Sequence, residues 1–174
     1  MTKPPTVVAK LAAILAITLN TGTANAEEQS LCPVDGKVLY EADAADGGFR
    51  VAVCGKPDTS DTIGTISVYS GTKETGGFTS TLLLQAQGKN REKAFVIRRY
   101  TRPQTTYLKF EFTAQDGRRY TIYDDFDNGQ TSTRVAWKKP SEGARAEPAD
   151  FVAVTEPLML MSLEAVVSVQ PYDE

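Results

Sequence analysis

Carboxylates are the residues of this sequence whose type and spacing could best support metal binding or catalysis. The densest group is Asp124–Gly129, with the sequence DDFDNG, and Asp, Asn and Gly are also what a tight turn requires for backbone reasons alone. If its glycine takes the sixth position of an EF-hand loop, Phe126 falls at position three and Val135 at position twelve, where calcium ligands should stand. We therefore expect a turn, with an irregular calcium site through Asp125 and Asp127 as the alternative.

The chain contains no histidine, which excludes Ser-His-Asp and Cys-His nucleophilic systems and histidine-bearing metal sites. Glycoside hydrolysis would need two carboxylates, such as Glu111 with Asp124 or Asp125, facing each other across a cleft. The expected strand register puts Glu111 and Asp124 on opposite faces of a sheet. We therefore expect a protein without enzymatic activity and without a cofactor, and we keep a carboxylate-dependent hydrolase as the enzyme alternative.

Residues 94–129 contain three strand-like runs and the turns between them. Apolar and polar residues alternate over 108–112, the period of two that turns one face of a strand toward a core. A three-residue loop at 115–117 pairs Phe112 with Tyr120, whereas a two-residue loop would set apolar side chains against polar ones. We therefore expect the longer loop, with its glycine in the left-handed conformation of a bulged turn.

This register places Asp124 on the core-facing side of its strand, where a carboxylate needs a partner. The preceding strand is expected at Ala94–Tyr100, and its exit loop at 101–105, because Pro103 has no amide hydrogen to donate to a ladder. If that loop closes the hairpin symmetrically, Arg98 reaches Asp124. We therefore expect a structural Arg98–Asp124 ion pair at the rim of the core.

The outward side of the same strands carries tyrosines and arginines, residue types that favour contact with proteins or carbohydrates. Loops held in place by a rigid sheet would concentrate these groups near 98–107 and 123–129. We expect binding to another protein or to an envelope glycan there. The residues expected at this surface are Arg102, Tyr107, Tyr123, Asp125 and Asp127.

The first 26 residues have the layout of a signal peptide. Lys3 and Lys10 supply a positive start, 11–19 an apolar run, and 24–26 a small-residue cleavage site. The apolar run is too short to span a bilayer, which needs roughly 20 residues. We therefore expect a periplasmic or secreted protein that does not insert into the membrane, with residues 27–174 as a single β domain.

Net charge bears on the partner of the mature protein, and the cysteine content bears on its compartment. Without the two lysines of the signal peptide, 19 − 2 = 17 basic residues remain against 22 acidic ones, a net charge of −5, which argues against nucleic acid as the partner. Cys32 and Cys54 are the two cysteines. In an oxidising compartment they are expected to form a disulfide that closes a loop of about twenty residues and contributes roughly 3 kcal/mol.

Strand-like runs recur along the rest of the chain at roughly ten-residue spacing, with turn residues between them. They lie at 37–41, 49–54, 65–70, 81–86, 131–137 and 151–155. Pro157, followed by helix formers over 158–167, predicts one short helix. The expected fold is all-β, an antiparallel barrel or sandwich of about eight strands with a short C-terminal helix.

Two segments, YTRPQTTY (Tyr100–Tyr107) and GRRYTIYDDFD (Gly117–Asp127), resemble a family of small secreted proteobacterial β proteins without an assigned activity. The resemblance implies a binding or envelope-associated protein. Members of that family carry a further cysteine pair near the C-terminus, which this chain lacks.

A weaker likeness rests on Gly55 after the Cys54 strand, on Gly117–Tyr120 and on the WKK segment from Trp137. These residues are similar to membrane-bound C-type lysozyme inhibitors, which are small eight-stranded barrels of the bacterial envelope. The family's loop serine before the glycine is not matched, because Asp116 stands there. The likeness implies lysozyme as a partner, met by the acidic turn, since host lysozymes are basic.

Overall fold

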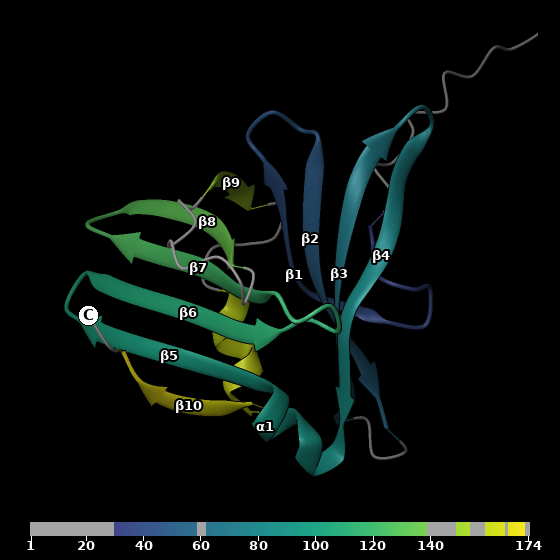
Figure 1. Cartoon of the computed structure of the whole chain (residues 1–174). Helices are drawn as coiled ribbons and strands as arrows, with labels where there is room; N and C mark the ends of the chain where they lie inside the picture. Colours follow the sequence, from purple (N-terminus) through teal and green to yellow (C-terminus); the bar gives the residue numbers. More distant parts are fainter. Residues whose placement is uncertain (1–29, 59–61, 139–148, 154–158, 166, 173–174) are drawn as a thin grey trace, which may run out of the picture.

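The computed structural model describes residues 30–58, 62–138, 149–153, 159–165 and 167–172, and these residues are mostly in β-strands (Figure 1). The expected signal peptide at 1–26 lies outside the described residues. The strands are β1 (Lys37–Ala44), β2 (Phe49–Pro57), β3 (Ile63–Glu74), β4 (Gly77–Gln87), β5 (Phe95–Arg102), β6 (Thr105–Thr113), β7 (Arg119–Asp127), β8 (Gln130–Lys138), β9 (Ala149–Ala153) and β10 (Ser168–Pro171). The helices are the 3₁₀ helices η1 (Gly88–Asn90) and η2 (Met159–Ala165) and the single-turn α1 (Arg91–Ala94).

The strands follow one another in a single ladder order, β10-β5-β6-β7-β8-β9-β1-β2-β3-β4. Figure 1 shows this sheet folded over into two layers, with β10 and β5–β8 in one, β1–β4 in the other, and β9 between β8 and β1. The order ends at β10 and β4, so the described strands are not closed into a barrel. Of the two expected architectures, the sandwich is the one that applies.

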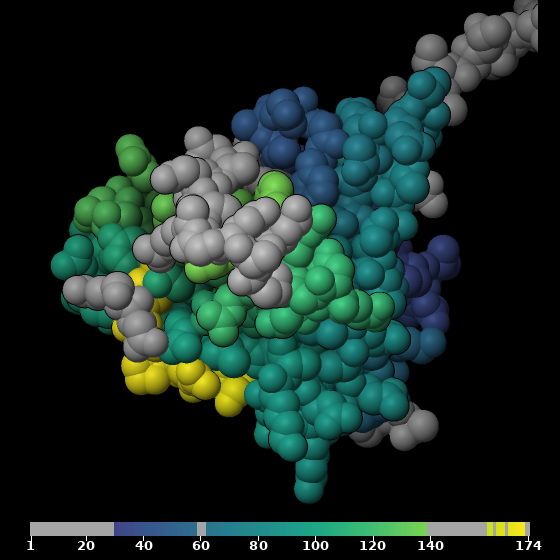
Figure 2. Space-filling view, in the orientation of Figure 1, coloured from purple at the N-terminus to yellow at the C-terminus, as the bar shows by residue number. Residues whose placement is uncertain are grey.

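The described residues contain ten strands where about eight were expected. Each of β1–β9 corresponds to one of the nine strand-like runs of the sequence. The strand without such a run is β10, which pairs with β5 in parallel, whereas the neighbouring pairs are antiparallel. Figure 2 shows β10 at the lower edge of its layer, beside β5. This strand brings a segment from the C-terminal part of the chain against the middle of the sequence.

The expected register of the central hairpin is confirmed. Phe112 pairs with Tyr120 and Phe110 with Ile122, and Gly117 in the loop has a φ of 82°. A left-handed φ of this kind is adopted readily by glycine, because it has no β-carbon to clash with the following carbonyl. The apolar face of β6 therefore meets the apolar face of β7, and both turn toward the core.

The core lies between the two layers. Phe110 stacks on Phe95 of β5 with ring centroids 5.4 Å apart, and side chains of the opposite layer, including Val53 and Val68, belong to the same buried cluster. The expected short helix is present as η2, which contacts β1 and β6 and buries Leu160 and Leu163 in that cluster. None of the helices in the described residues is long and apolar enough to cross a membrane.

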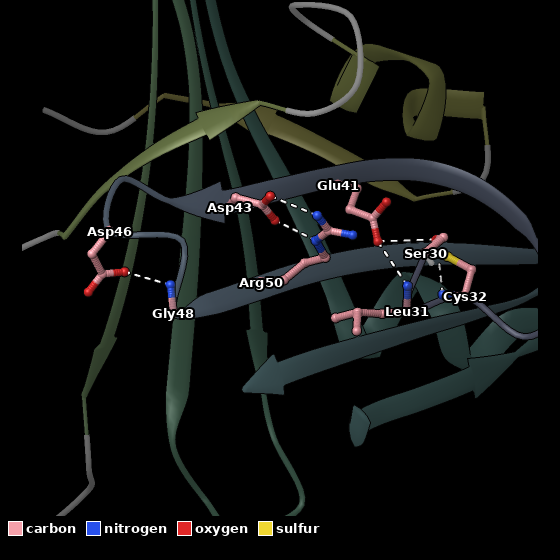
Figure 3. Close-up of polar contacts among 8 residues, drawn as sticks. All are labelled: Ser30, Leu31, Cys32, Glu41, Asp43, Asp46, Gly48 and Arg50. Carbon is pink, nitrogen blue, oxygen red and sulfur yellow. Dashed lines mark hydrogen bonds and ion pairs between the residues drawn. The ribbon is translucent and has the colours of Figure 1, made fainter. Parts of the chain in front are cut away.

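Part of the other face of β1–β4 is covered by residues 30–36, the described segment before β1. The expected disulfide joins Cys32 to Cys54 of β2, with 5.6 Å between the Cα atoms. Leu31 donates its backbone N–H to Glu41 Oε1 at 3.0 Å (Figure 3). Leu31, Ala52 and Cys54 form a second, smaller buried cluster. The disulfide therefore holds the segment before β1 against this face of the sheet.

A buried ion pair lies on the same face. Arg50 of β2 is 1% exposed and donates from Nε and Nη2 to the two carboxylate oxygens of Asp43 on β1 (Figure 3). Its guanidinium also lies over the Phe78 ring, 4.4 Å from the centroid. The arginine thus has its charge balanced while its planar group packs against an aromatic ring.

β4 forms one end of the ladder order. Its sequence, GFTSTLLLQAQ, contains no charged residue and no proline. A bulge places Leu83 opposite the step between Val68 and Tyr69 of β3, and the Leu83 carbonyl accepts the backbone N–H of Gln115 at 3.0 Å. The loop between β6 and β7 therefore provides a hydrogen-bond donor for one backbone carbonyl of β4.

Candidate functional site

Cross-strand pairing sets the outward side chains of β5–β8 in rows, because paired residues of adjacent strands point to the same face. The row nearest the turns contains Arg102, Thr105, Asp127 and Gln130. The next contains Tyr100, Tyr107, Asp125 and Ser132. The third contains Arg98, Lys109, Tyr123 and Arg134.

A pocket of about 960 Å³ lies over these rows. This volume falls within the range of roughly 300–1,000 Å³ that is usual for ligand sites. Its walls are made by most of the first two rows, together with Asn128, Thr131, Arg134 and Tyr172. Tyr172 follows β10, so the parallel strand is what brings it to the pocket.

Three tyrosines form the aromatic part of the wall. The rings of Tyr100 and Tyr107 are nearly parallel, with centroids 6.0 Å apart, and Tyr172 is tilted by 47° against Tyr107 at 6.2 Å. The Lys109 ammonium lies 3.7 Å from the centroid of the Tyr172 ring. Burial, followed by the nearby negative charge of Asp125, raises the pKa of Tyr172 to about 12.

Asp125 is part of the pocket floor, with 8% of its side chain exposed. Its Oδ2 accepts a hydrogen bond from Arg134 Nη2 at 2.8 Å, and its Oδ1 accepts one from the Leu108 backbone N–H at 3.3 Å. Burial raises the pKa of the Asp125 carboxyl, and the hydrogen bond and charge of Arg134 oppose this rise. The Arg134 guanidinium also lies over the Tyr123 ring, 4.8 Å from its centroid.

Asp127 organises the turn at the end of the pocket. It accepts hydrogen bonds from Thr105 Oγ1 at 2.7 Å, Asn128 Nδ2 at 3.0 Å and the Tyr107 hydroxyl at 3.3 Å. The Asn128 backbone N–H donates to the Gln104 carbonyl at 2.8 Å, which joins the β7–β8 turn to the β5–β6 turn. The two turns thus hold each other in place beside the pocket.

Four of the five residues expected at a partner-binding surface line this pocket, namely Arg102, Tyr107, Asp125 and Asp127. The fifth, Tyr123, lies in the adjacent row beneath Arg134. Asp125 and Asp127 are also the residues of the alternative calcium site. Among the described residues no group of three or more acidic or cysteine side chains is arranged to hold a metal ion.

The structure corrects the expected Arg98–Asp124 ion pair. The turn between β5 and β6 has two residues, Pro103 and Gln104, because Arg102 pairs directly with Thr105. Arg98 therefore points outward, where its Nε contacts Glu111 Oε2 at 2.6 Å. Asp124 is 1% exposed on the core side.

The core-facing surroundings of Asp124 include a buried tyrosine. The side chain of Tyr40 is fully buried, and its pKa is raised by burial first and by the charge of Asp124 second. Thr133, the partner of Asp124 on β8, is buried as well. Tyr40, Asp124 and Thr133 therefore form a small cluster of polar side chains on the core side of the sheet that carries the pocket.

Several pocket residues were missed by the sequence reasoning. Ser132 and Arg134 alternate with the buried Thr133 and Val135 along β8, so the period of two in that strand was the signal that could have found them. Tyr172 carried no such signal, since its position depends on a parallel strand that local sequence did not predict.

No protein-family model matches this chain, and no curated protein or solved structure matches it either. The class of protein is therefore defined by its own architecture. It is a disulfide-bonded, two-layered β protein with a polar and aromatic pocket on the outside of one layer.

Proposed function

We propose that this protein is a periplasmic or secreted, non-enzymatic binding protein that holds its ligand in the pocket over β5–β8. The observation that carries the proposal is the convergence of Arg102, Tyr107, Asp125 and Asp127 on one pocket of ligand-binding size. Their backbones belong to paired strands, which restrict side-chain position more than loops do. A rigid scaffold with a preformed pocket supports binding.

The engagement of the carboxylates supports the non-enzymatic reading. Both oxygens of Asp125 and both of Asp127 accept hydrogen bonds from the protein. Glu111 is paired with Arg98 and does not line the pocket. Hydrolysis by a carboxylate pair would need one free acid and one free base facing the substrate.

The lysozyme-inhibitor alternative requires an acidic surface at 124–129. Asp124 faces the core, and the carboxylate of Asp125 is buried against Arg134. Of the three carboxylates, only that of Asp127 therefore remains to attract a basic partner. The pocket is the better-supported site, and the resemblance to small secreted proteobacterial proteins is compatible with it.

Export can be tested by mass. The disulfide supports an oxidising compartment, because such bonds are rare in the bacterial cytosol. Protein recovered from the periplasm or medium of an expressing bacterium is expected to begin at Glu27 and to have the mass of the oxidised chain. A mass that retains residues 1–26 would contradict cleavage, and two free thiols would contradict the disulfide.

Replacing Arg102 with alanine is expected to weaken ligand binding at least about tenfold, since truncating an arginine at a binding hot spot commonly costs about 2 kcal/mol or more. The measurement is retention of material from a bacterial envelope extract on the immobilised protein. Arg119→Ala is the matched control, because Arg119 is exposed on the same sheet and does not line the pocket.

Both variants are expected to unfold at the wild-type temperature, because the two arginines are exposed. Retained material that is lost with Arg102→Ala and kept with Arg119→Ala supports the pocket. Equal retention by all three proteins would contradict the proposed function.

A further inference from the structure

We propose that the ligand of this pocket is a neutral, polyhydroxylated saccharide. This inference rests on the proposed function and specifies its ligand class. Three features of the pocket support it: the balance of charge, the set of hydrogen-bonding groups that remain available, and the arrangement of the tyrosines.

The charges of the pocket oppose a strongly charged ligand of either sign. Two carboxylates, Asp125 and Asp127, and two guanidiniums, Arg102 and Arg134, line it. Asp125 and Arg134 neutralise each other at 2.8 Å. An anion would meet Asp127 and a cation would meet Arg102, so a neutral ligand enters with the least electrostatic cost.

Several hydrogen-bonding groups of the pocket are available to a ligand. The side chains of Arg102, Gln130 and Ser132 make no hydrogen bond to another described residue. Together they supply guanidinium and amide N–H donors, an amide oxygen acceptor and a hydroxyl that does both. A saccharide hydroxyl also donates and accepts, so a ring with several hydroxyls can satisfy this mixed set.

The zwitterionic alternative, an amino acid or short peptide, fits less well. Its ammonium group would need a carboxylate with accessible oxygens. The oxygens of Asp127 already accept hydrogen bonds from Thr105, Tyr107 and Asn128, and Asp125 is paired with Arg134. The donors of Arg102, in contrast, are open to a neutral acceptor.

The tyrosines supply the apolar part of the recognition. Tyr100 is 42% exposed and lies nearly parallel to Tyr107, and Tyr172 closes the wall at an angle. The C–H face of a sugar ring can pack on such rings while its hydroxyls turn to the polar side chains. The pocket volume of about 960 Å³ admits more than one sugar ring.

The test is titration of the exported, uniformly ¹⁵N-labelled protein followed by amide NMR shifts. Maltotriose, cellotriose and triacetylchitotriose are the saccharide probes. Glycylglycine, inorganic phosphate and putrescine represent zwitterionic, anionic and cationic ligands. We expect at least one trisaccharide to shift the amides of Tyr100, Asp127 and Tyr172 saturably at millimolar concentration, with smaller or no shifts from the charged probes.

Tyr100→Ala is expected to weaken binding of the active trisaccharide at least tenfold, whereas Tyr100→Phe keeps most of the affinity because it retains the ring. Arg119→Ala should bind as the wild type does. Saturable shifts at the pocket with a charged probe alone, or with no probe, would overturn the saccharide assignment. Pocket-dependent retention of envelope material would still stand in that case, so failure of the ligand class and failure of the proposed function are distinguishable.

Discussion

Replacing Phe110 with alanine is expected to lower the free energy of unfolding by about 4 kcal/mol. Phe110 is fully buried, and its ring contacts Phe95 at 5.4 Å and Phe112 at 5.8 Å between centroids. Alanine would remove the ring from a close-packed interior and leave a cavity that the sheets cannot fill by moving together. Urea unfolding followed by circular dichroism measures the loss.

Thr113→Ala is the control for this change, because Thr113 lies on the same strand and is exposed. Its effect on stability is expected to stay within about 0.5 kcal/mol. If Phe110→Ala cost less than about 1 kcal/mol, the packing of the two layers around this ring would be wrong.

Replacing Asp43 with alanine is expected to lower the free energy of unfolding by about 4 kcal/mol, as much as Phe110→Ala, although Asp43 itself is partly exposed. The reason is Arg50, which is almost fully buried and would lose the carboxylate that its Nε and Nη2 contact. Removing one partner of a largely buried ion pair typically costs about 3–5 kcal/mol. The loss is measured by chemical unfolding at neutral pH.

A double variant separates charge from packing at this pair. Asp43→Ala combined with Arg50→Met removes both charges and leaves an apolar side chain of similar length under Phe78. Its stability is expected within about 1 kcal/mol of wild type. Asp35→Ala is the matched control, because the Asp35–Lys56 pair is solvent-exposed and its loss should hardly change stability. A double variant as unstable as Asp43→Ala would contradict this account.

The register of β6 and β7 could be predicted because it is determined by local sequence. Both strands alternate with a period of two, and Gly117 marks the residue that takes a positive φ. The register of β5 and β6 could not be predicted in the same way. Its turn places Gln104 at a φ of 63°. This conformation could not be predicted from the sequence, because residues other than glycine rarely adopt it.

A shift of one residue in that turn decides which side chains of β5 face the core. The expected symmetric loop turned Arg98 inward, and the observed turn points it outward to Glu111. The same shift places Tyr100 and Arg102 in the pocket. Four pocket residues, Arg102, Tyr107, Asp125 and Asp127, could therefore be predicted from the sequence, whereas the outward position of Arg98 depended on a turn length that composition does not determine.

The contribution of the C-terminal part of the chain was not predictable from local pattern at all. Arg98 and the Pro171 carbonyl are 73 residues apart in sequence and 3.4 Å apart in space. A strand of four residues such as β10 has too little periodicity of its own to be distinguished from a helix end. Its pairing, and the position of Tyr172 with it, come from tertiary contacts.

The two ends of the strand order differ in a way that matters for concentrated solutions of this protein. β10 ends in Pro171, which cannot donate to a further strand, whereas β4 has neither proline nor charge along its length. Within the described residues, the backbone of β4 outside the Gln115–Leu83 contact offers a template for another chain. Self-association at high concentration is therefore expected to begin at residues 77–82 of β4. Thr81 is exposed, so the substitution Thr81→Lys would place a charge on this strand and is expected to keep the protein monodisperse.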